Sequence, residues 1–272
     1  MFFDFLLLRQ IILLAGCGAA AYTDTKTGLI FDKITYPMIA AGIVLNIAEQ
    51  QWLFLAAGAI VFAIGYVIYY MGKFGGGDVK LFTGIAFLLP FFQGNFFLLN
   101  SLFAACLLAV SFYSTYFLVK YARKGISLKE NRQSMRRALF FGAAIAAYLS
   151  AIAFMQVMAW QSVAVLVLPL ALAILFLAFE KGIRGSFFLK QVELNKLEED
   201  EVIAADFLDE KTKTALNLKV KGVFGEKEIQ TLKEIGVKKV PVYRGMPPFA
   251  PFILLGVVVA ILLPDFLGLL FS

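Results

Sequence analysis

The stretch Gly75-Gly76-Gly77-Asp78 lies between two long apolar segments, residues 53–71 and 79–92. A carboxylate at the edge of a membrane segment is energetically costly and rare, and where it occurs it is usually functional. Glycine adopts backbone conformations that other residues avoid, so we expect the three glycines to let the chain fold tightly around the acid. A second acid, Asp24, ends an earlier apolar stretch. Acids at the ends of two membrane helices can meet, which makes Asp24 and Asp78 a candidate pair.

The composition is that of a membrane protein and it excludes several kinds of chemistry. Hydrophobic residues make up 61% of the chain and charged residues only 16%, as in proteins that span a bilayer. There is no histidine, which removes Ser-His-Asp and Cys-His catalysis and every His-ligated metal site. The two cysteines, Cys17 and Cys106, are too far apart in sequence for a C-x-x-C zinc pair. We therefore expect no metal or cofactor, and hydrolysis would need carboxylates or a serine with a lysine.

Eight apolar stretches have the character of membrane-spanning helices. They are residues 5–23, 34–48, 53–71, 79–92, 95–119, 138–159, 162–179 and 249–270. The stretch 79–92 is short: at about 1.5 Å per residue it reaches about 21 Å, against a hydrocarbon core of about 30 Å. Either Asp78 lies in a wet recess below the membrane surface or the bilayer thins there. In both cases a membrane-embedded substrate can reach the acid.

The segments rich in lysine and arginine are all expected on the same side of the membrane. Of the 25 lysines and arginines, all except Arg9 lie in the connecting segments 24–33, 72–80, 120–137 and 180–247. The opposite loops, 49–52, 91–94 and 160–161, hold none. Because cytoplasmic loops are enriched in Lys and Arg, we expect Asp24, Asp32 and Asp78 to face the cytoplasm. Arg9 lies within the first apolar stretch, and we expect its side chain to snorkel toward the outer surface.

The expected fold is an all-α polytopic membrane helix bundle of about eight transmembrane helices with a small cytoplasmic α+β domain. Residues 1–179 would form the bundle, residues 180–247 the cytoplasmic domain, and residues 248–272 a C-terminal transmembrane helix. Within the cytoplasmic domain, Leu216–Val220 and Val237–Tyr243 have the pattern of strands and Glu226–Ile235 that of a helix.

Two carboxyl groups held a few ångströms apart cannot both ionise easily, so the pair loses its two protons at separate pKa values. One group then stays protonated while the other acts as a base that activates water. This is the chemistry of aspartyl proteases, and it needs neither a metal nor a histidine.

Two motifs resemble those of a known family. The segment Tyr22-Thr23-Asp24-Thr25-Lys26, followed by Gly75-Gly76-Gly77-Asp78-Val79-Lys80, is similar to the type IV prepilin peptidases, which are GxGD membrane aspartyl proteases. The resemblance covers roughly residues 10–120. The segments 236–240 and 245–249 resemble the C-terminal domain of the archaeal members, which process archaellins and pilins.

The resemblance implies that Asp24 and Asp78 are the catalytic aspartates and that Gly75 and Gly77 are the motif glycines. The implied reaction removes the short basic leader from a pilin-like or archaellin precursor at the cytoplasmic membrane face. Asp32 falls where the family often has an acid after the first loop, although it is also a simple loop acid beside Lys33. Bacterial relatives often add a cysteine-rich zinc region and a methyltransferase activity. This chain has no C-x-x-C pairs, so the resemblance does not imply a zinc site here.

Two nearby lysines and a basic segment admit both functional and structural roles. Lys26 and Lys80 would hold the negative charge of the acid pair in place or anchor the helix ends through phospholipid. The segment 120–137 is expected to set topology and contact anionic membrane lipid, and nucleic acid is not an expected partner.

Three other functions compete with the peptidase. A cation- or proton-coupled transporter would use Asp24, Asp32 and Asp78 as a relay, but no inverted repeat with broken helices is evident. An intramembrane protease of the presenilin type would carry a Pro-Ala-Leu motif near the C-terminus, which this chain lacks. A Ser-Lys signal peptidase would need a serine–lysine pair at a helix end, and none stands out.

Overall fold

The computed structural model describes residues 5–71, 74–155 and 160–194, and then 202–204, 207–208, 212, 226–234, 236–237 and 239–271. Each of the eight apolar stretches overlaps a helix. These helices are α1 (Phe5–Thr27), α2 (Asp32–Ala48), α3 (Trp52–Tyr70), α4 (Gly76–Leu88), α5 (Phe97–Lys124), α6 (Leu128–Phe154), α7 (Trp160–Ala178) and α11 (Ala250–Leu262). Three shorter helices are α8 (Glu180–Phe187), α10 (Glu226–Glu234) and α12 (Gly268–Phe271).

The chain is a multi-pass membrane protein with fewer full-length spans than the eight expected. Among the described residues, α1, α3, α5 and α6 are long and apolar enough to cross a membrane. The pair α7 and α8, bent by 70° at a short break, makes up to five. Helices α2, α4 and α11 have 17, 13 and 13 residues and fall below that length.

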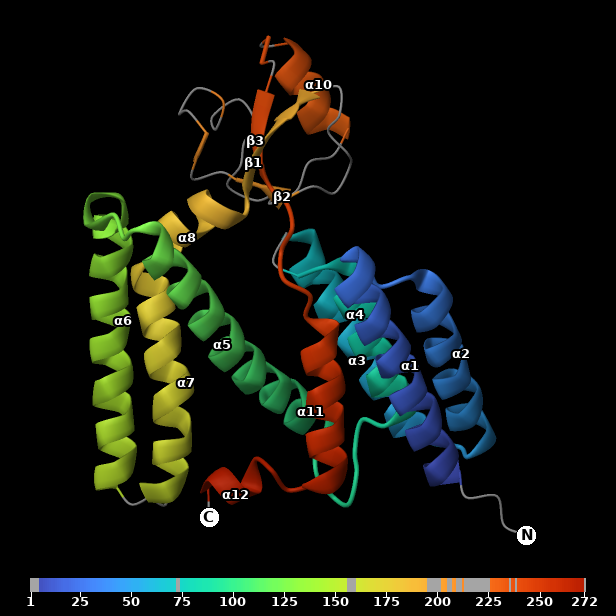
Figure 1. Ribbon diagram of the computed structural model, residues 1–272. Helices are drawn as coiled ribbons and strands as arrows, with labels where there is room; N and C mark the ends of the chain where they lie inside the picture. The colour runs from blue at the N-terminus through green and yellow to red at the C-terminus, as the bar shows by residue number, and fades with distance from the viewer. Residues whose placement is uncertain are drawn as a thin grey trace.

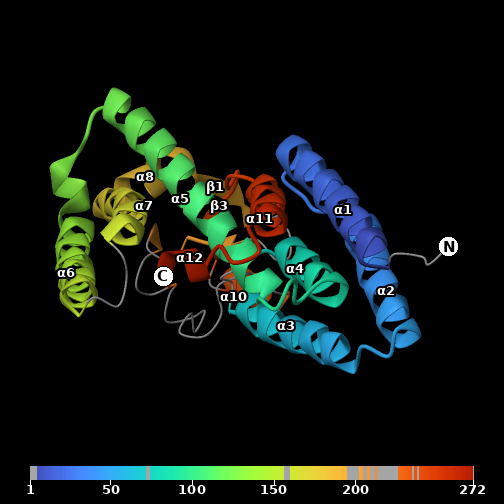
Figure 2. The same cartoon turned by 90° about the horizontal axis from the view of Figure 1, so that it is seen from below.

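The helices run up and down between two ends of the molecule (Figure 1). Helix α4 packs on α2 and α3, while α11 packs on α1 and α5. Helices α6 and α7 pack on each other and meet the rest of the bundle through α5, which crosses the molecule diagonally (Figures 1 and 2). The end of α1, the start of α4, α8 and the β-sheet lie at one end, and α12 lies at the other (Figure 1).

The main hydrophobic core lies among α1, α2, α4 and α11. Leu13 of α1, Met38 of α2, Leu81 and Ile85 of α4 and Ile253 of α11 are all buried there. Helix α4 contributes most: nine of its residues are buried, an unbroken run from Val79 to Leu88 apart from Lys80. A short helix enclosed on all sides in this way is a central element of the bundle rather than a lipid-facing one.

Arg9 does not snorkel to the surface, so that expectation is wrong. The residue is only 2% exposed. It donates to Glu49, at the end of α2, and to the carbonyl of Leu88. A partly buried partner of opposite charge removes the reason for the guanidinium to seek water.

The basic segment 120–137 is not a loop as expected. Helix α5 continues to Lys124, and α6 begins at Leu128. Gly125 ends α5 with a φ of 99°, a left-handed conformation that favours glycine. Ser127 then caps α6 by accepting a hydrogen bond from the Glu130 backbone N–H. The basic residues therefore lie on two helix ends joined by a short turn.

A small three-stranded sheet follows the bundle. Its strands are β1 (Leu189–Glu193), β2 (Val202–Ile203) and β3 (Lys239–Tyr243), in the order β1-β3-β2, and both pairs are antiparallel. Val192, Val240, Val242 and Leu232 of α10 form its core. The expected helix Glu226–Ile235 is found as α10, and the expected strand Val237–Tyr243 as β3. The expected strand Leu216–Val220 lies outside the described residues.

Candidate active site

Asp24 lies in the last turn of α1 and is almost completely buried, with 8% of its surface exposed. The helix ends after it because Gly28 adopts a φ of 71° and donates its backbone N–H to the Asp24 carbonyl at 2.8 Å. The Asp24 side chain accepts a hydrogen bond from a distant helix: the backbone N–H of Ala250, the first residue of α11, lies 2.9 Å from Oδ2. The first N–H groups of a helix have no partner within it. This contact therefore gives the Ala250 N–H an acceptor and at the same time orients the Asp24 carboxyl group.

Asp78 lies in the first turn of α4 and is half-buried. Gly75 is the N-cap residue, so Asp78 does not cap its own helix. Gly75 has an ordinary extended conformation, with φ −71° and ψ 140°, and the three glycines are absent from the positive-φ residues. The expectation that they permit unusual backbone conformations is therefore wrong.

The glycines are needed for space instead. A Cβ on Gly75 would lie 2.8 Å from Oδ2 of Asp78, where it would push the carboxyl group aside. A Cβ on Gly77 would lie 2.9 Å from the Cβ of Ile30 and 3.3 Å from its carbonyl oxygen, in the turn between α1 and α2. Glycine at these positions lets the first turn of α4 approach the end of α1, which carries Asp24.

The two acids belong to different helices, but the end of α1 and the start of α4, which carry them, lie at the same end of the molecule (Figure 1). An aromatic cluster joins the segments beside them: Phe249, next to Ala250, packs against Phe74 and Phe82, with ring centroids 6.2 and 6.4 Å apart. These aromatic rings lie beside the end of the molecule that carries the two carboxyl groups.

Asp32 and Lys80 form an ion pair beside this site. Asp32 begins α2, and its Oδ1 lies 2.5 Å from the Lys80 Nζ of α4. The Lys80 ammonium also lies over the Tyr36 ring, 5.1 Å from its centroid. The pair joins the start of α2 to Lys80 of α4, two residues after Asp78. Lys26 lies over the Tyr22 ring at 5.3 Å.

Sequence reasoning missed the part played by the segment before α11. Besides the Ala250 N–H on Asp24, the Tyr113 hydroxyl of α5 donates to the Pro248 carbonyl at 2.6 Å. This segment also connects β3 directly to α11. The available signal was the run Met246-Pro247-Pro248 before an apolar stretch, because it marks a helix start whose free N–H groups need acceptors.

Among the described residues, no three His, Cys, Asp or Glu side chains gather closely enough to hold a metal ion. The candidate site consists of the Asp24 carboxyl group, oriented by the N-terminus of α11, and the Asp78 carboxyl group at the start of α4.

The part of the chain that carries both acids is similar to known proteins. Residues 11–110 match the model of the type IV leader peptidase family. A prepilin peptidase, EppA, from the archaeon Methanothermobacter thermautotrophicus is 41% identical over 93 residues. Residues 11–110, which we call the leader peptidase segment, are thus similar to the type IV leader peptidase family. The leader peptidase segment contains Asp24, Asp32, Gly75, Gly77 and Asp78, and it confirms the resemblance seen in the sequence.

The match with EppA is partial in both directions. It covers 31% of this chain and 24% of the relative, so this chain spans about a quarter of the length of the curated relative. Helices α6 and α7, the sheet and α11 lie outside the leader peptidase segment. Ala250, which donates to Asp24, is therefore supplied to the leader peptidase segment from outside it.

Proposed function

We propose that this protein is a membrane aspartyl endopeptidase that removes the short basic leader from type IV pilin-like precursors, including archaellins. The observation that carries the proposal is that Asp24, in the last turn of α1, and Asp78, in the first turn of α4, lie at the same end of the bundle within residues 11–110 that match the leader peptidase model. A named prepilin peptidase is 41% identical to this chain over 93 residues. No metal or cofactor takes part in the proposed reaction.

In this mechanism the two carboxyl groups share one proton. The ionised group takes a proton from a water molecule, whose oxygen attacks the carbonyl carbon of the scissile peptide bond. The protonated group donates its proton to the carbonyl oxygen as the tetrahedral intermediate forms. The group that took the proton from water donates it to the leaving nitrogen when the C–N bond breaks. The Ala250 N–H binds Oδ2 of Asp24, which leaves Oδ1 for the water.

The cytoplasmic orientation rests on charge. The end of the molecule that holds both acids is rich in basic residues. It contains Lys26 near the end of α1, Lys80 near the start of α4, the helix ends around residue 125 and the sheet. Basic segments remain in the cytoplasm, so the acids face it, and the eight helices alternate across the membrane. The sheet, within residues 180–247, forms a separate cytoplasmic domain beside the site. A precursor held in the membrane by its apolar helix presents its leader at this same surface.

The arrangement favours peptidase over transporter. A relay for cations or protons needs polar groups in sequence across the membrane. Asp24, Asp32 and Asp78 lie together at one end, and Asp32 is paired with Lys80.

The test is cleavage of a synthetic precursor, with a basic leader and an apolar helix, by the purified full chain in lipid vesicles. We expect Asp24→Asn and Asp78→Asn each to lower kcat at least about 10³-fold, because removing one member of a catalytic unit disables the whole unit. Asp265→Asn, after α11 at the other end of the molecule, is the matched control and should cleave normally.

Retained cleavage in either dyad variant would overturn the assignment. EDTA and serine-directed reagents should leave the rate unchanged, and inhibition by either would favour a different reaction class.

A further inference from the structure

The depth of Asp78 in the membrane depends on a helix that is too short to set its own depth. Helix α4 has 13 residues and a length of about 20 Å, whereas the hydrocarbon core is about 30 Å thick. A full-length span is held at its depth by matching the bilayer. Helix α4 cannot be held in this way, so other contacts must fix it along its axis and in rotation.

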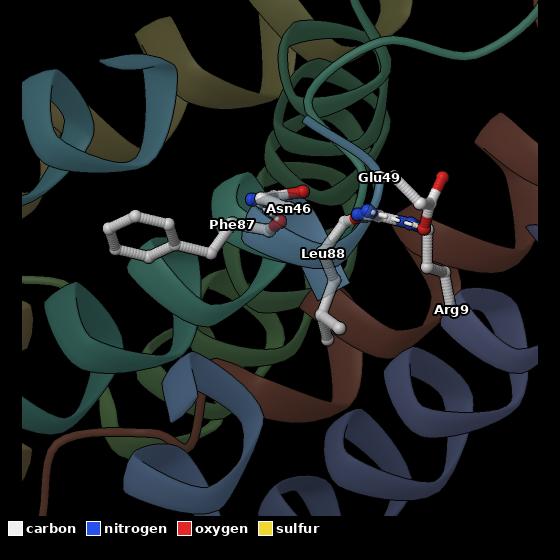
Figure 3. Close-up of polar contacts among 5 residues, drawn as sticks. All are labelled: Arg9, Asn46, Glu49, Phe87 and Leu88. Atoms are coloured by element: carbon white, nitrogen blue, oxygen red, sulfur yellow. Dashed lines mark hydrogen bonds and ion pairs between the residues drawn. The ribbon is translucent and has the colours of Figure 1, made fainter. Parts of the chain in front are cut away.

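Two buried side chains hold the far end of α4, opposite Asp78. Arg9 Nη1 of α1 donates to the Leu88 carbonyl at 2.7 Å, and Asn46 Nδ2 of α2 donates to the Phe87 carbonyl at 2.8 Å. Figure 3 shows both groups directed at this last turn. The last carbonyls of a helix have no partner within it, and inside an apolar bundle water does not supply one.

Arg9 is built into this position. Its Nε and Nη2 both donate to Glu49 Oε1, at 3.1 and 3.0 Å, which leaves Nη1 directed at Leu88. The guanidinium also lies over the Phe54 ring at 5.4 Å. A positive charge at a helix C-terminus complements the negative end of the helix dipole. Arg9 thus caps α4 by hydrogen bonding and by charge.

Asn46 has a feature that stability alone does not explain. It is fully buried, yet its Oδ1 has no hydrogen-bond partner among the described residues, and a buried polar atom without a partner is destabilising. One turn earlier on α2, a Cβ at Gly42 would lie 2.7 Å from the Phe87 Cβ and 2.8 Å from its carbonyl carbon. Helix α2 therefore touches the backbone of α4 at the turn where Asn46 donates.

We propose that Arg9 and Asn46 are positioning residues that fix the depth and rotation of α4 and so hold Asp78 opposite Asp24. We call these two residues the α4 anchor. The inference rests on the proposed peptidase function for its activity readout, but the position of Asp78 can be measured without activity. The anchor lies at the end of the bundle away from the acids and contacts neither of them.

The first test uses cleavage. Arg9→Met combined with Glu49→Met removes both charges and leaves neither unpaired. We expect it to lower kcat at least about 10-fold with KM within about twofold, because substrate contacts remain. Asn46→Leu should also lower kcat. Arg9→Lys keeps a charged donor, so its kcat should lie between that of the double variant and that of the unmodified protein. Arg184→Met with Glu180→Met is the matched control, since it removes an ion pair of the same type in α8, and it should cleave normally.

The second test measures position. In a chain with Cys17→Ala and Cys106→Ala, the changes Asp24→Cys and Asp78→Cys place thiols at the positions of the two acids, and a short bis-maleimide joins them by forming a thioether bond with each thiol. Adding the Arg9/Glu49 double change should lower the cross-linking yield at least threefold, while the Arg184/Glu180 control should not. Intrinsic fluorescence and gel filtration in the same detergent establish that each variant is folded.

Unchanged cross-linking in a folded anchor variant would overturn the proposal, whether or not cleavage falls, because the anchor would then have only a structural role. If the unmodified protein fails to cleave any precursor, the proposed function fails, while the cross-linking result still decides the anchor. Unchanged kcat together with lowered cross-linking would also overturn the link between the anchor and catalysis.

Discussion

Helices α1–α4 with α11, the inner bundle, are joined by buried polar contacts, whereas α6 and α7, the outer pair, meet around an apolar cavity. In the inner bundle, side chains of one helix bond the backbone of another: Arg9 to Leu88, Asn46 to Phe87 and Asp24 to Ala250. The cavity of the outer pair has a volume of about 390 Å³ and its lining includes Gly142, Leu149 and Ile174. Directional contacts fix helix positions more narrowly than apolar ones do, and the inner bundle is the part that holds both acids.

Apart from changes to the two acids themselves, the largest expected effect comes from removing one directional contact of the inner bundle. Ala250→Pro deletes the N–H that binds Asp24 while keeping a residue that suits a first helical position. A hydrogen bond to a charged group contributes about 1.5–3 kcal/mol, so kcat should fall about 10- to 100-fold. Steady-state cleavage of the synthetic precursor measures it.

Ala250→Gly is the matched control because it changes the side chain and keeps the N–H. It should retain most of the rate. Equal losses in the proline and glycine variants would show that the side chain, rather than the N–H, matters at this position.

A pair of glycine substitutions compares the packing of the two regions. Gly42→Ala in the inner bundle forces a Cβ to within 2.8 Å of the Phe87 backbone, whereas the same change at Gly142 in the outer pair places it 3.4 Å from the Ile174 side chain. Overpacking a close contact costs about 1–3 kcal/mol, and an ordinary contact costs little. Thermal unfolding in detergent should therefore show a lower midpoint for Gly42→Ala only. Similar midpoints for both variants would mean that the two regions are packed alike.

Sequence reasoning reached the features that a local pattern encodes. Each apolar run overlaps a helix among the described residues because burial in lipid requires a continuous stretch of hydrophobic residues, but only four or five of these helices are long and apolar enough to span a membrane, so the expected count of eight spans is not confirmed. The glycines before Asp78 and the acid at the end of α1 pointed to the candidate site. The reason assigned to the glycines was wrong, since space beside Ile30 and Asp78 cannot be read without knowing what packs there.

The contacts that position the site were out of reach because they join distant residues. Arg9 and Leu88 are 79 positions apart, and Asp24 and Ala250 are 226 apart. Nothing in the chain around Arg9 marks its acceptor. Glu49, the only acid of the segment 49–52, which holds no basic residue, was the available hint, because an arginine in an apolar stretch needs an acidic partner near the same end of its helix.

The smallest expected effect is at the exposed edge of the inner bundle, where Asp32 and Lys80 pair. Their side chains are 50% and 31% exposed, and ion pairs at exposed positions contribute about 0.2–1 kcal/mol. Lys80→Met should therefore lower cleavage by no more than about fivefold. The wild-type rate should decline toward that of the variant as salt rises, since salt screens exposed charges. Rates at low and high salt measure this, and the charge swap Asp32→Lys with Lys80→Asp should restore part of the difference. A loss of 100-fold or more, insensitive to salt and not restored by the swap, would instead place Lys80 in the reaction itself. In that case Lys80 would act on the substrate or the acids, and the Asp32–Lys80 pair would be more than a contact at the exposed edge of the inner bundle.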